Sequence, residues 1–287
     1  MDFATVLGFF FAMGAVVWAM YEGTEGRLGA FYSTEGCVLV IGGSIACAAM
    51  SMPMEALKKL PAYLKQYLFH KGQEPKHIIT QIVQFAEIAR RDGVLALENS
   101  VKNTTDPFLK KGLQLAIDGA DPHVIEQVLE IEVSSMEERH HHGRKLFELM
   151  GKYGPALGLT ATLVGQVVMF MKMSGPSPAE AGAAGHGGEG GGGGGGDQSA
   201  QIAKALAIAL LGTLYGTLWA NLICGPVSDK LAIRSKEELF NKQIIIQGIL
   251  AIQAGDNPRI VESKLLSFLS SAERAHMPAL AGGGEKK

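Results

Sequence analysis

The chain has 287 residues, of which 47% are hydrophobic and 19% are charged, and its formal net charge is −2 at pH 7. This balance gives no case for nucleic-acid binding, and it favours membrane helices that alternate with water-soluble helices. The three cysteines are odd in number and scattered, which argues against a disulfide framework and against a cysteine metal cluster.

Four stretches lack any charge over a length that can cross a membrane: Phe3–Tyr21, Gly36–Met54, Tyr153–Met171 and Ala205–Ser228. At about 1.5 Å per residue, even the nineteen residues of the third stretch nearly match the roughly 30 Å hydrocarbon core of a bilayer. The first stretch lacks the basic start of a secretory signal and ends in aromatic residues, so we interpret it as a retained helix. The sequence therefore predicts an all-α integral membrane protein with four transmembrane helices.

The distribution of basic residues predicts the orientation of these helices. Lysine and arginine occur 14 times between Pro53 and Lys152 and 9 times after Ser228, which together is 23 of the 26 in the chain. Since cytoplasmic loops of membrane proteins are enriched in basic residues, we expect both of these segments to be cytoplasmic. The N-terminus and the C-terminus are then cytoplasmic as well.

Four regions follow in chain order. Residues 1–54 hold transmembrane helices 1 and 2, with a stop at Pro53, and residues 55–150 form a cytoplasmic helical domain. In this domain an apolar helical pattern ends at Gly93, and Asp106 and Asp121 each precede a proline, as N-cap residues do. The helix that starts after Asp121 is expected to run almost to the membrane.

Residues 151–228 hold transmembrane helices 3 and 4 and a glycine-rich extracytoplasmic loop, residues 174–200. That loop lacks the Gly-Lys-Ser/Thr ending of a phosphate-binding loop, and we interpret it as a flexible linker. Residues 229–287 form the cytoplasmic C-terminal part, with two helices separated near Asp256 and a disordered end.

Helix 4 carries its small residues on one side and its leucines mostly on the other, and helix 3 has a comparable stripe of small and polar residues. This pattern has two interpretations, close helix packing or a polar conduit, and both remain open at this point. The small side of helix 4 comprises Ala205, Ala209, Gly212, Thr213, Gly216, Thr217 and Ala220, and the stripe of helix 3 comprises Gly158, Thr162, Gly165, Gln166 and Met169.

None of the four stretches contains Asp, Glu, Lys, Arg or His, whereas ion-translocating proteins usually keep such a residue at membrane depth. If the chain moves ions, a membrane partner must supply the carboxylate. The run His140-His141-His142 cannot converge on one metal from a regular helix, so no metal site is expected. No nucleophile and base occur at usable spacing, so we expect neither an enzyme nor a cofactor.

Three sequence runs carry a family resemblance: Arg90 to Glu98 (RRDGVLALE), the run from Gly154 (GPALGLTATLVG) and the run from Leu210 (LLGTLYG). Together with the four-helix plan, they resemble the MotA/PomA family, subunits of the bacterial flagellar stator in the MotA/TolQ/ExbB proton channel superfamily. The likeness extends to about Ala272. The chain departs from the family in its glycine tract, which lengthens the loop between helices 3 and 4.

The resemblance implies an ion-conducting stator subunit of the bacterial inner membrane, with protons as the translocated ion and sodium as the alternative. Five copies would surround two single-pass MotB/PomB-type partners, whose aspartate acts in the ion path. The assembly would lie in membrane lipid, and its cytoplasmic part would push on the rotor switch protein FliG. An ExbB/TolQ-like energy transducer and a non-transporting scaffold are the alternatives. The residue roles carried over are the ion path for Thr162, Thr213 and Thr217, conformational coupling for Pro155 and Pro226, and rotor contact for Arg90, Arg91 and Glu98.

Overall fold

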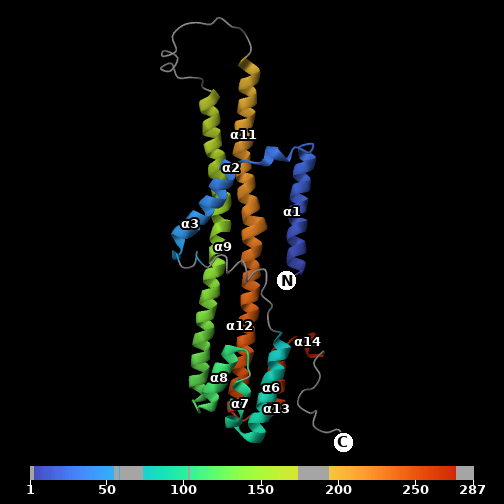
Figure 1. Ribbon diagram of the computed structural model, residues 1–287, viewed down its shortest axis with the longest axis vertical. Coiled ribbons are helices and arrows are strands. Elements are labelled where there is room, and N and C mark those ends of the chain that lie inside the picture. The colour runs from blue at the N-terminus through green and yellow to red at the C-terminus, as the bar shows by residue number, and fades with distance from the viewer. Residues whose placement is uncertain (1–2, 55–57, 59–73, 103, 174–193, 276–287) are drawn as a thin grey trace. The chain divides into compact units, whose positions relative to one another are not determined.

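The computed structural model describes residues 3–54, 58, 74–102, 104–173 and 194–275 (Figure 1). Throughout these ranges every regular element is helical and none is a strand. Four helices are long and apolar enough to cross a membrane, with apolar stretches in Val6–Gly23, Leu28–Ser51, Pro122–Met171 and Ala209–Gln253. The predicted all-helical fold with four membrane-spanning helices is thereby confirmed at this level.

The chain divides into two compact units, each described here by itself. The first comprises Met1–His70 and His142–Leu231, and the second comprises Lys71–His141 and Ala232–Lys287. The long helices α9 (Pro122–Met173) and α12 (Gly225–Gln253) contribute residues to both.

In the first unit, α1 (Phe3–Gly23) leads through a 3₁₀ turn (Leu28–Phe31) to the second span. The sequence predicts one regular helix there, whereas the structure has α2 (Thr34–Cys37), a π-helical turn (Val38–Gly42) and α3 (Gly43–Ser51). The helix ends before Pro53 as expected, because a residue preceding proline is driven to extended backbone, and Met52 has φ −136° and ψ 155°.

The third and fourth spans continue without a break into the neighbouring helical segments. Helix α9 has 52 residues and passes through Pro155, so it is longer than the sequence indicates. Helix α11 (Gly194–Leu218) leads through a second π-helical turn (Trp219–Cys224) directly into α12. Because α11 begins at Gly194, it includes residues that the sequence assigns to the glycine-rich loop. The rest of that loop, residues 174–193, and the expected disordered end, residues 276–287, lie outside the described residues.

The second unit is built from α6 (Pro75–Asp92), a 3₁₀ turn (Val94–Ala96), α7 (Leu97–Lys102), α8 (Pro107–Ile117), α13 (Pro258–Leu266), α14 (Ser271–Ala275) and parts of α9 and α12. The predicted break after α6 is confirmed, since Gly93 has φ +86°, which favours glycine. Both predicted N-caps are also confirmed. The Asp106 carboxylate accepts from the Phe108 N–H at 2.9 Å, and the Asp121 carboxylate accepts from the His123 N–H at 2.9 Å.

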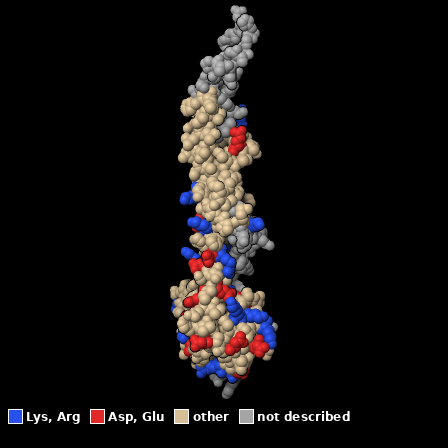
Figure 2. Space-filling view, turned by 90° about the vertical axis from the view of Figure 1, so that its left-hand side faces the viewer, with Lys and Arg blue, Asp and Glu red and all other residues tan. Residues whose placement is uncertain are grey.

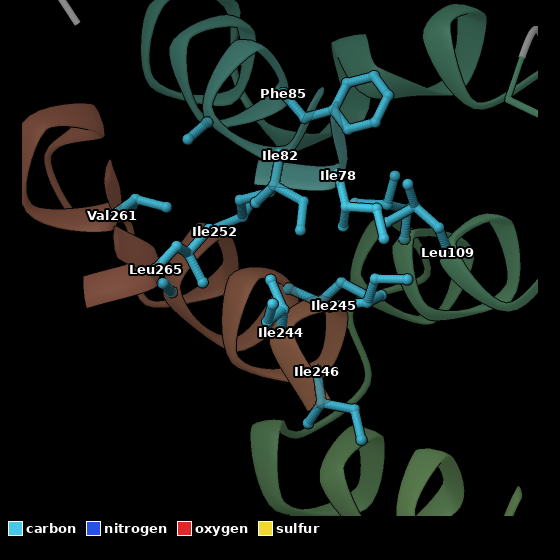
Figure 3. Close-up of a cluster of buried hydrophobic side chains, with 14 of the residues drawn as sticks. Ile78, Ile82, Phe85, Leu109, Ile244, Ile245, Ile246, Ile252, Val261 and Leu265 are labelled. Atoms are coloured by element: carbon cyan, nitrogen blue, oxygen red, sulfur yellow. The ribbon is translucent and has the colours of Figure 1, made fainter. Parts of the chain in front are cut away.

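The core of the second unit surrounds the end of α12. Ile244, Ile245 and Ile246 are consecutive and each is at most 1% exposed, so this helix is enclosed on all sides. Figure 3 shows them among side chains of α6, α8 and α13, including Ile82, Leu109 and Leu265. The apolar run of α12 is therefore the centre of the core of the second unit.

Charge is distributed differently over the two units. Figure 2 shows many Lys, Arg, Asp and Glu side chains on the surface of the second unit, and a long uncharged surface over the apolar helices of the first. In the first unit, the Val6–Gly23 stretch of α1 has no buried residue within the chain. An unburied helix of this length, whose one charged residue is Glu22 at its end, suits a lipid environment or contact with another chain.

Candidate ion path and rotor-contact surface

Helices α9 and α11 approach each other through their small residues. A Cβ added at Gly158 would lie 2.7 Å from the Gly212 carbonyl oxygen, and one added at Gly216 would lie 2.6 Å from the Gly154 carbonyl oxygen. At Gly165 an added Cβ would lie 2.5 Å from the Ala209 Cβ. The backbones are in contact, as small-xxx-small pairs allow. The small side of helix 4 therefore serves close packing against helix 3 over this stretch.

The same interface contains two of the three threonines predicted for the ion path. The Thr162 and Thr213 hydroxyl oxygens are 2.5 Å apart, and Thr162 is only 8% exposed. The Thr162 hydroxyl also lies 2.9 Å from the Ala209 carbonyl and 3.1 Å from its own-helix carbonyl at Gly158. Packing and polar chemistry thus coincide here, although the sequence presents them as alternatives.

The number of hydroxyl protons limits how this pair can be hydrogen-bonded, and either threonine can be the donor. Thr162 has one proton and lies beside two carbonyl oxygens that can only accept. If it donates to one of them, Thr213 must donate its own proton to the Thr162 oxygen, since the Gly158 carbonyl is farther from Thr213 at 3.4 Å. The half-buried Thr213 oxygen then keeps lone pairs for a cation or a water molecule.

Thr217 lies one turn beyond Thr213 on α11 and is not part of this network. Its hydroxyl bonds to carbonyls of its own helix, at 3.1 Å to Thr213 and 2.9 Å to Leu214, and the residue is exposed. The structure therefore brings Thr162 and Thr213 together and leaves Thr217 at an open surface of the same helix.

The two prolines predicted for conformational coupling lie inside continuous helical runs, although proline commonly marks a helix end. Pro155 is within α9 and offers no N–H to the Gly151 carbonyl. Pro226 is the second residue of α12, directly after the π-helical turn, where the Gly225 N–H bonds to the Ala220 carbonyl. Both positions weaken the backbone ladder without interrupting the helix.

These prolines flank a stretch in which the two helices touch. A Cβ added at Gly151 would lie 3.2 Å from the Cys224 Cβ, and one added at Gly216 would lie 3.0 Å from the Pro155 Cα. The Trp219 indole Nε1 is buried here without a hydrogen-bond partner among the described residues. The weakened ladders of α9 and α12 thus lie on either side of a tightly packed contact.

Sequence reasoning missed Tyr215, which ties helix 4 to the start of helix 2. Its hydroxyl accepts from the Ser33 N–H at 2.8 Å and donates to the Phe31 carbonyl. Ser33 in turn caps α2 by accepting from the Gly36 N–H at 3.2 Å. A tyrosine in a membrane span needs a partner for its hydroxyl, and that requirement could have indicated the contact.

The three residues predicted for rotor contact lie together at the end of α6 and the start of α7, and all three are exposed. Arg91 binds Asp92, with 2.8 Å between Nη2 and Oδ2, and Glu98 pairs with Lys102 at 3.2 Å. The hydrogen bond from Arg91 holds the pKa of the Asp92 carboxyl below its usual value, so Asp92 stays ionised at neutral pH. Arg90 has no such partner within the described ranges.

The model of the MotA/TolQ/ExbB proton channel family matches residues 100–187. Motility protein A of Borreliella burgdorferi is 36% identical over 283 residues, which cover 99% of this chain and 100% of that protein. The chemotaxis protein PomA of Vibrio alginolyticus is 34% identical over 275 residues, which cover 96% of this chain and 98% of that protein.

The chain belongs to the MotA/PomA family of flagellar stator subunits.

Two solved structures of this family match the fold over nearly the whole chain. MotAB of C. jejuni aligns with a TM-score of 0.80 and 25% identity over 94% of this chain and 97% of that one. The flagellar MotAB stator complex of Bacillus subtilis aligns with a TM-score of 0.79 and 26% identity over the same shares. The chain is thus a multi-pass membrane protein of the MotA fold, from a family of stator and ion-channel subunits that are not known as enzymes.

Within the described part of this MotA-family chain, no group of three or more His, Cys, Asp or Glu residues could hold a metal ion. Of the consecutive histidines, His140 lies 3.0 Å through Nδ1 from the Ser235 hydroxyl and 3.7 Å through Nε2 from the Glu238 carboxylate. His140 therefore links α9 to α12 within the second unit.

Proposed function

We propose that this stator subunit conducts protons, along a path shared with a MotB-type single-pass partner, and converts that flow into torque on the flagellar rotor. The observation that carries the proposal is the Thr162–Thr213 hydroxyl pair between α9 and α11, within the stretches Tyr153–Met171 and Ala205–Ser228 that contain no Asp, Glu, Lys, Arg or His. Hydroxyls can pass on a proton or coordinate a cation, but they cannot hold charge at membrane depth. The partner's aspartate supplies that charge.

The hydrogen bonds of the two threonines suggest separate roles for this chain and its partner in ion transport. Thr213 presents oxygen lone pairs toward the path, while Thr162 holds Thr213 in place from the buried side. The partner carboxylate takes up the ion and releases it toward the cytoplasm. One charge crossing about 150 mV releases roughly 3.5 kcal/mol, enough to shift two helix arrangements of similar energy. Pro155 and Pro226 are the places where α9 and α12 bend in that shift.

The assembly proposed is five copies of this chain around two partner chains in the bacterial inner membrane. The segments rich in lysine and arginine, the helical unit that contains α6 to α8, and both termini face the cytoplasm. The MotAB complexes among the structural relatives support a partner of this kind. FliG is the proposed rotor partner of Arg90, Arg91 and Glu98, and lipid surrounds the outer helices.

Protons are the favoured ion because the matching family model describes a proton channel family, and sodium is the alternative. The test uses a bacterium without stators of its own that produces this chain and its MotB-type partner. We expect swimming to persist when sodium is replaced by potassium and to stop when a protonophore is added. Swimming that stops on sodium withdrawal and survives the protonophore would replace protons by sodium in the proposal.

The second candidate is an ExbB/TolQ-like energy transducer, which the same family model includes. Such proteins usually have three spans, and the four candidate spans of this chain favour the stator. The third candidate, a non-transporting scaffold, is tested by replacing the partner's aspartate with asparagine. A stator loses both motility and ion flux with that change, whereas a scaffold keeps its role.

A further inference from the structure

The 3₁₀ turn between α6 and α7 presents a leucine to solvent. Leu95 is 74% exposed, more than any other large hydrophobic residue described in the second unit. A 3₁₀ turn has three residues per turn, so Val94 and Leu97 lie on one side of it and Leu95 on the other. Leu97 is fully buried and Val94 packs against the core. The fold therefore holds the turn rigidly and directs Leu95 outward.

The backbone fixes this presentation. Gly93, with φ +86°, reverses the chain after α6, and its carbonyl accepts from the Ala96 N–H at 3.1 Å. The turn is bounded by a helix on each side, so Leu95 is not on a loose loop. An apolar side chain on a rigid, exposed turn is the kind of feature that fills a pocket on a partner.

The charges around Leu95 are largely neutralised within the chain. Arg91 is held by Asp92 and Glu98 by Lys102, and in both pairs the side chains are well exposed. Exposed pairs of this kind change an affinity by at most about fivefold. Arg90 is the cation of this surface that has no ion-pair partner in the described part of the chain. An acidic group on a binding partner would therefore pair with it.

We propose that Leu95 is the anchor of the rotor-contact surface and inserts into an apolar pocket of the rotor protein, with an acidic group beside that pocket facing Arg90. The inference rests on the proposed function and deepens it. Burial of a leucine side chain changes an affinity by about 10- to 100-fold, which exceeds the contribution of any exposed ion pair nearby. Leu95 holds the contact, and the charged residues orient it and speed encounter.

The test measures binding of the purified complex of this chain and its MotB-type partner to purified FliG, at low and at high salt. Leu95→Ala is expected to weaken binding about 10- to 100-fold at both salt concentrations, because apolar burial is not screened. Arg90→Ala is expected to weaken it up to about fivefold, and only at low salt. The matched control is Ile131→Ala, which truncates a 66% exposed side chain elsewhere in the same unit and should leave binding unchanged.

Ion flux and torque separate this inference from the proposed function. Leu95→Ala should leave flux through the complex unchanged while stall torque falls. Normal torque and normal FliG binding in Leu95→Ala would overturn the inference and leave the stator function standing. A wild-type chain that restores no motility would overturn the function itself. Loss of oligomer size in Leu95→Ala, or loss of binding to anionic lipid vesicles without loss of FliG binding, would assign the leucine to a second copy or to the membrane and would also overturn the inference.

Discussion

The Thr162 hydroxyl has a single proton and two carbonyl acceptors within reach, so when it donates to one of them its oxygen accepts the proton of Thr213. In the buried interface of α9 and α11, an unsatisfied hydroxyl oxygen costs about 1 to 3 kcal/mol. The two threonines therefore stabilise the helix pair, and in the proposed function they also line the ion path. A change at either one alters both.

Replacing Thr213 by valine keeps the shape of the side chain and removes its hydroxyl. We expect ion flux to fall at least about tenfold, because the path loses its open oxygen and Thr162 loses its donor. Thr213→Ser should retain most of the flux. Flux is measured as cytoplasmic acidification in cells that produce the chain with its partner.

The control for this experiment is Thr160→Val on α9. Thr160 is exposed, and its hydroxyl bonds only to the Ala156 carbonyl of its own helix, at 3.0 Å. The Thr160→Val variant should conduct ions at the wild-type rate. If Thr213→Val also conducts normally, the Thr162–Thr213 hydroxyl pair serves only helix packing and is not part of the ion path.

At this scale the sequence predicted which residue types matter but not how they are paired. Thr162 and Thr213 are 51 residues apart, and nothing in their local pattern shows that they share a hydrogen bond. In the same way, Arg90 and Arg91 look equivalent in the sequence. Only the backbone turn at Gly93 and the position of Asp92 show that Arg91 is bound within the chain.

Among the elements, the contact between α9 and α11 is set by residues with little or no side chain. Gly158 and Gly212 lie against each other's backbones; Thr162 lies one turn after Gly158, and Thr213 directly follows Gly212. The separation of the helices is thus fixed by glycine, and the threonine contact depends on that separation. Any added atom at the glycines must move the threonines apart.

Gly158→Ala should separate the helices, because the new methyl group would lie 2.7 Å from the Gly212 carbonyl oxygen. We expect a loss of about 1 to 3 kcal/mol in stability, as for other overpacked sites, and a loss of ion flux through the broken threonine contact. Thermal unfolding of the purified complex measures the first effect and proton flux the second.

Gly14→Ala on α1 is the matched control, since its methyl group would meet nothing within 4 Å in the chain. It should leave both measurements unchanged. Wild-type stability and flux in Gly158→Ala would show that the helices can shift apart without consequence, contrary to the packing described above.

The sequence predicted the spans because charge-free windows are long and unmistakable, but it could not predict how the helices join. In a sequence, proline commonly indicates the end of a helix. Helix α9 nevertheless continues through Pro155, because the other backbone hydrogen bonds of α9 and its packing against α11 stabilise the helix there. The two π-helical turns left no local signal, since Val38–Gly42 and Trp219–Cys224 consist mostly of apolar residues that also suit a regular membrane helix, with Asn221 as the polar exception.

For the whole molecule, the second unit depends on a buried ion pair as well as on its apolar core. The Lys242 ammonium lies 2.9 Å from the Asp106 carboxylate, and each side chain is 11% exposed. The same carboxylate caps α8, so one aspartate joins α12 to the start of that helix. The pair therefore holds together segments 136 residues apart in the sequence.

Lys242→Met should destabilise the second unit by about 3 kcal/mol, because it leaves the Asp106 charge buried without its partner. The double variant Asp106→Asn/Lys242→Met should recover most of that loss, since asparagine still caps α8 and carries no charge. Thermal unfolding of the full complex provides the measurement. A double variant no more stable than Lys242→Met alone would show that the loss does not come from the unpaired charge.

At the scale of the molecule, the four candidate spans and the helical segments between and after them could be predicted from composition and charge. The expectation of a membrane partner rests on what the spans lack, namely Asp, Glu, Lys, Arg and His, and it stays a prediction for this chain. The contacts of α1 could not be predicted in the same way. No residue of its Val6–Gly23 stretch is buried by the described part of the chain, so what covers this apolar surface depends on other molecules and not on this sequence alone.

The hydrogen bonds of the Tyr215 hydroxyl have a consequence for the order in which the chain folds during synthesis. It fixes Phe31 and Ser33, at the start of the second membrane helix, from a position 182 residues later in the chain. At roughly 5 to 20 residues per second, a ribosome needs about 10 to 35 s to make the intervening chain. Throughout that interval the beginning of helix 2 is inserted without this anchor. The start of the second membrane helix therefore gains its hydrogen bonds to Tyr215 only after helix 4 has been synthesised.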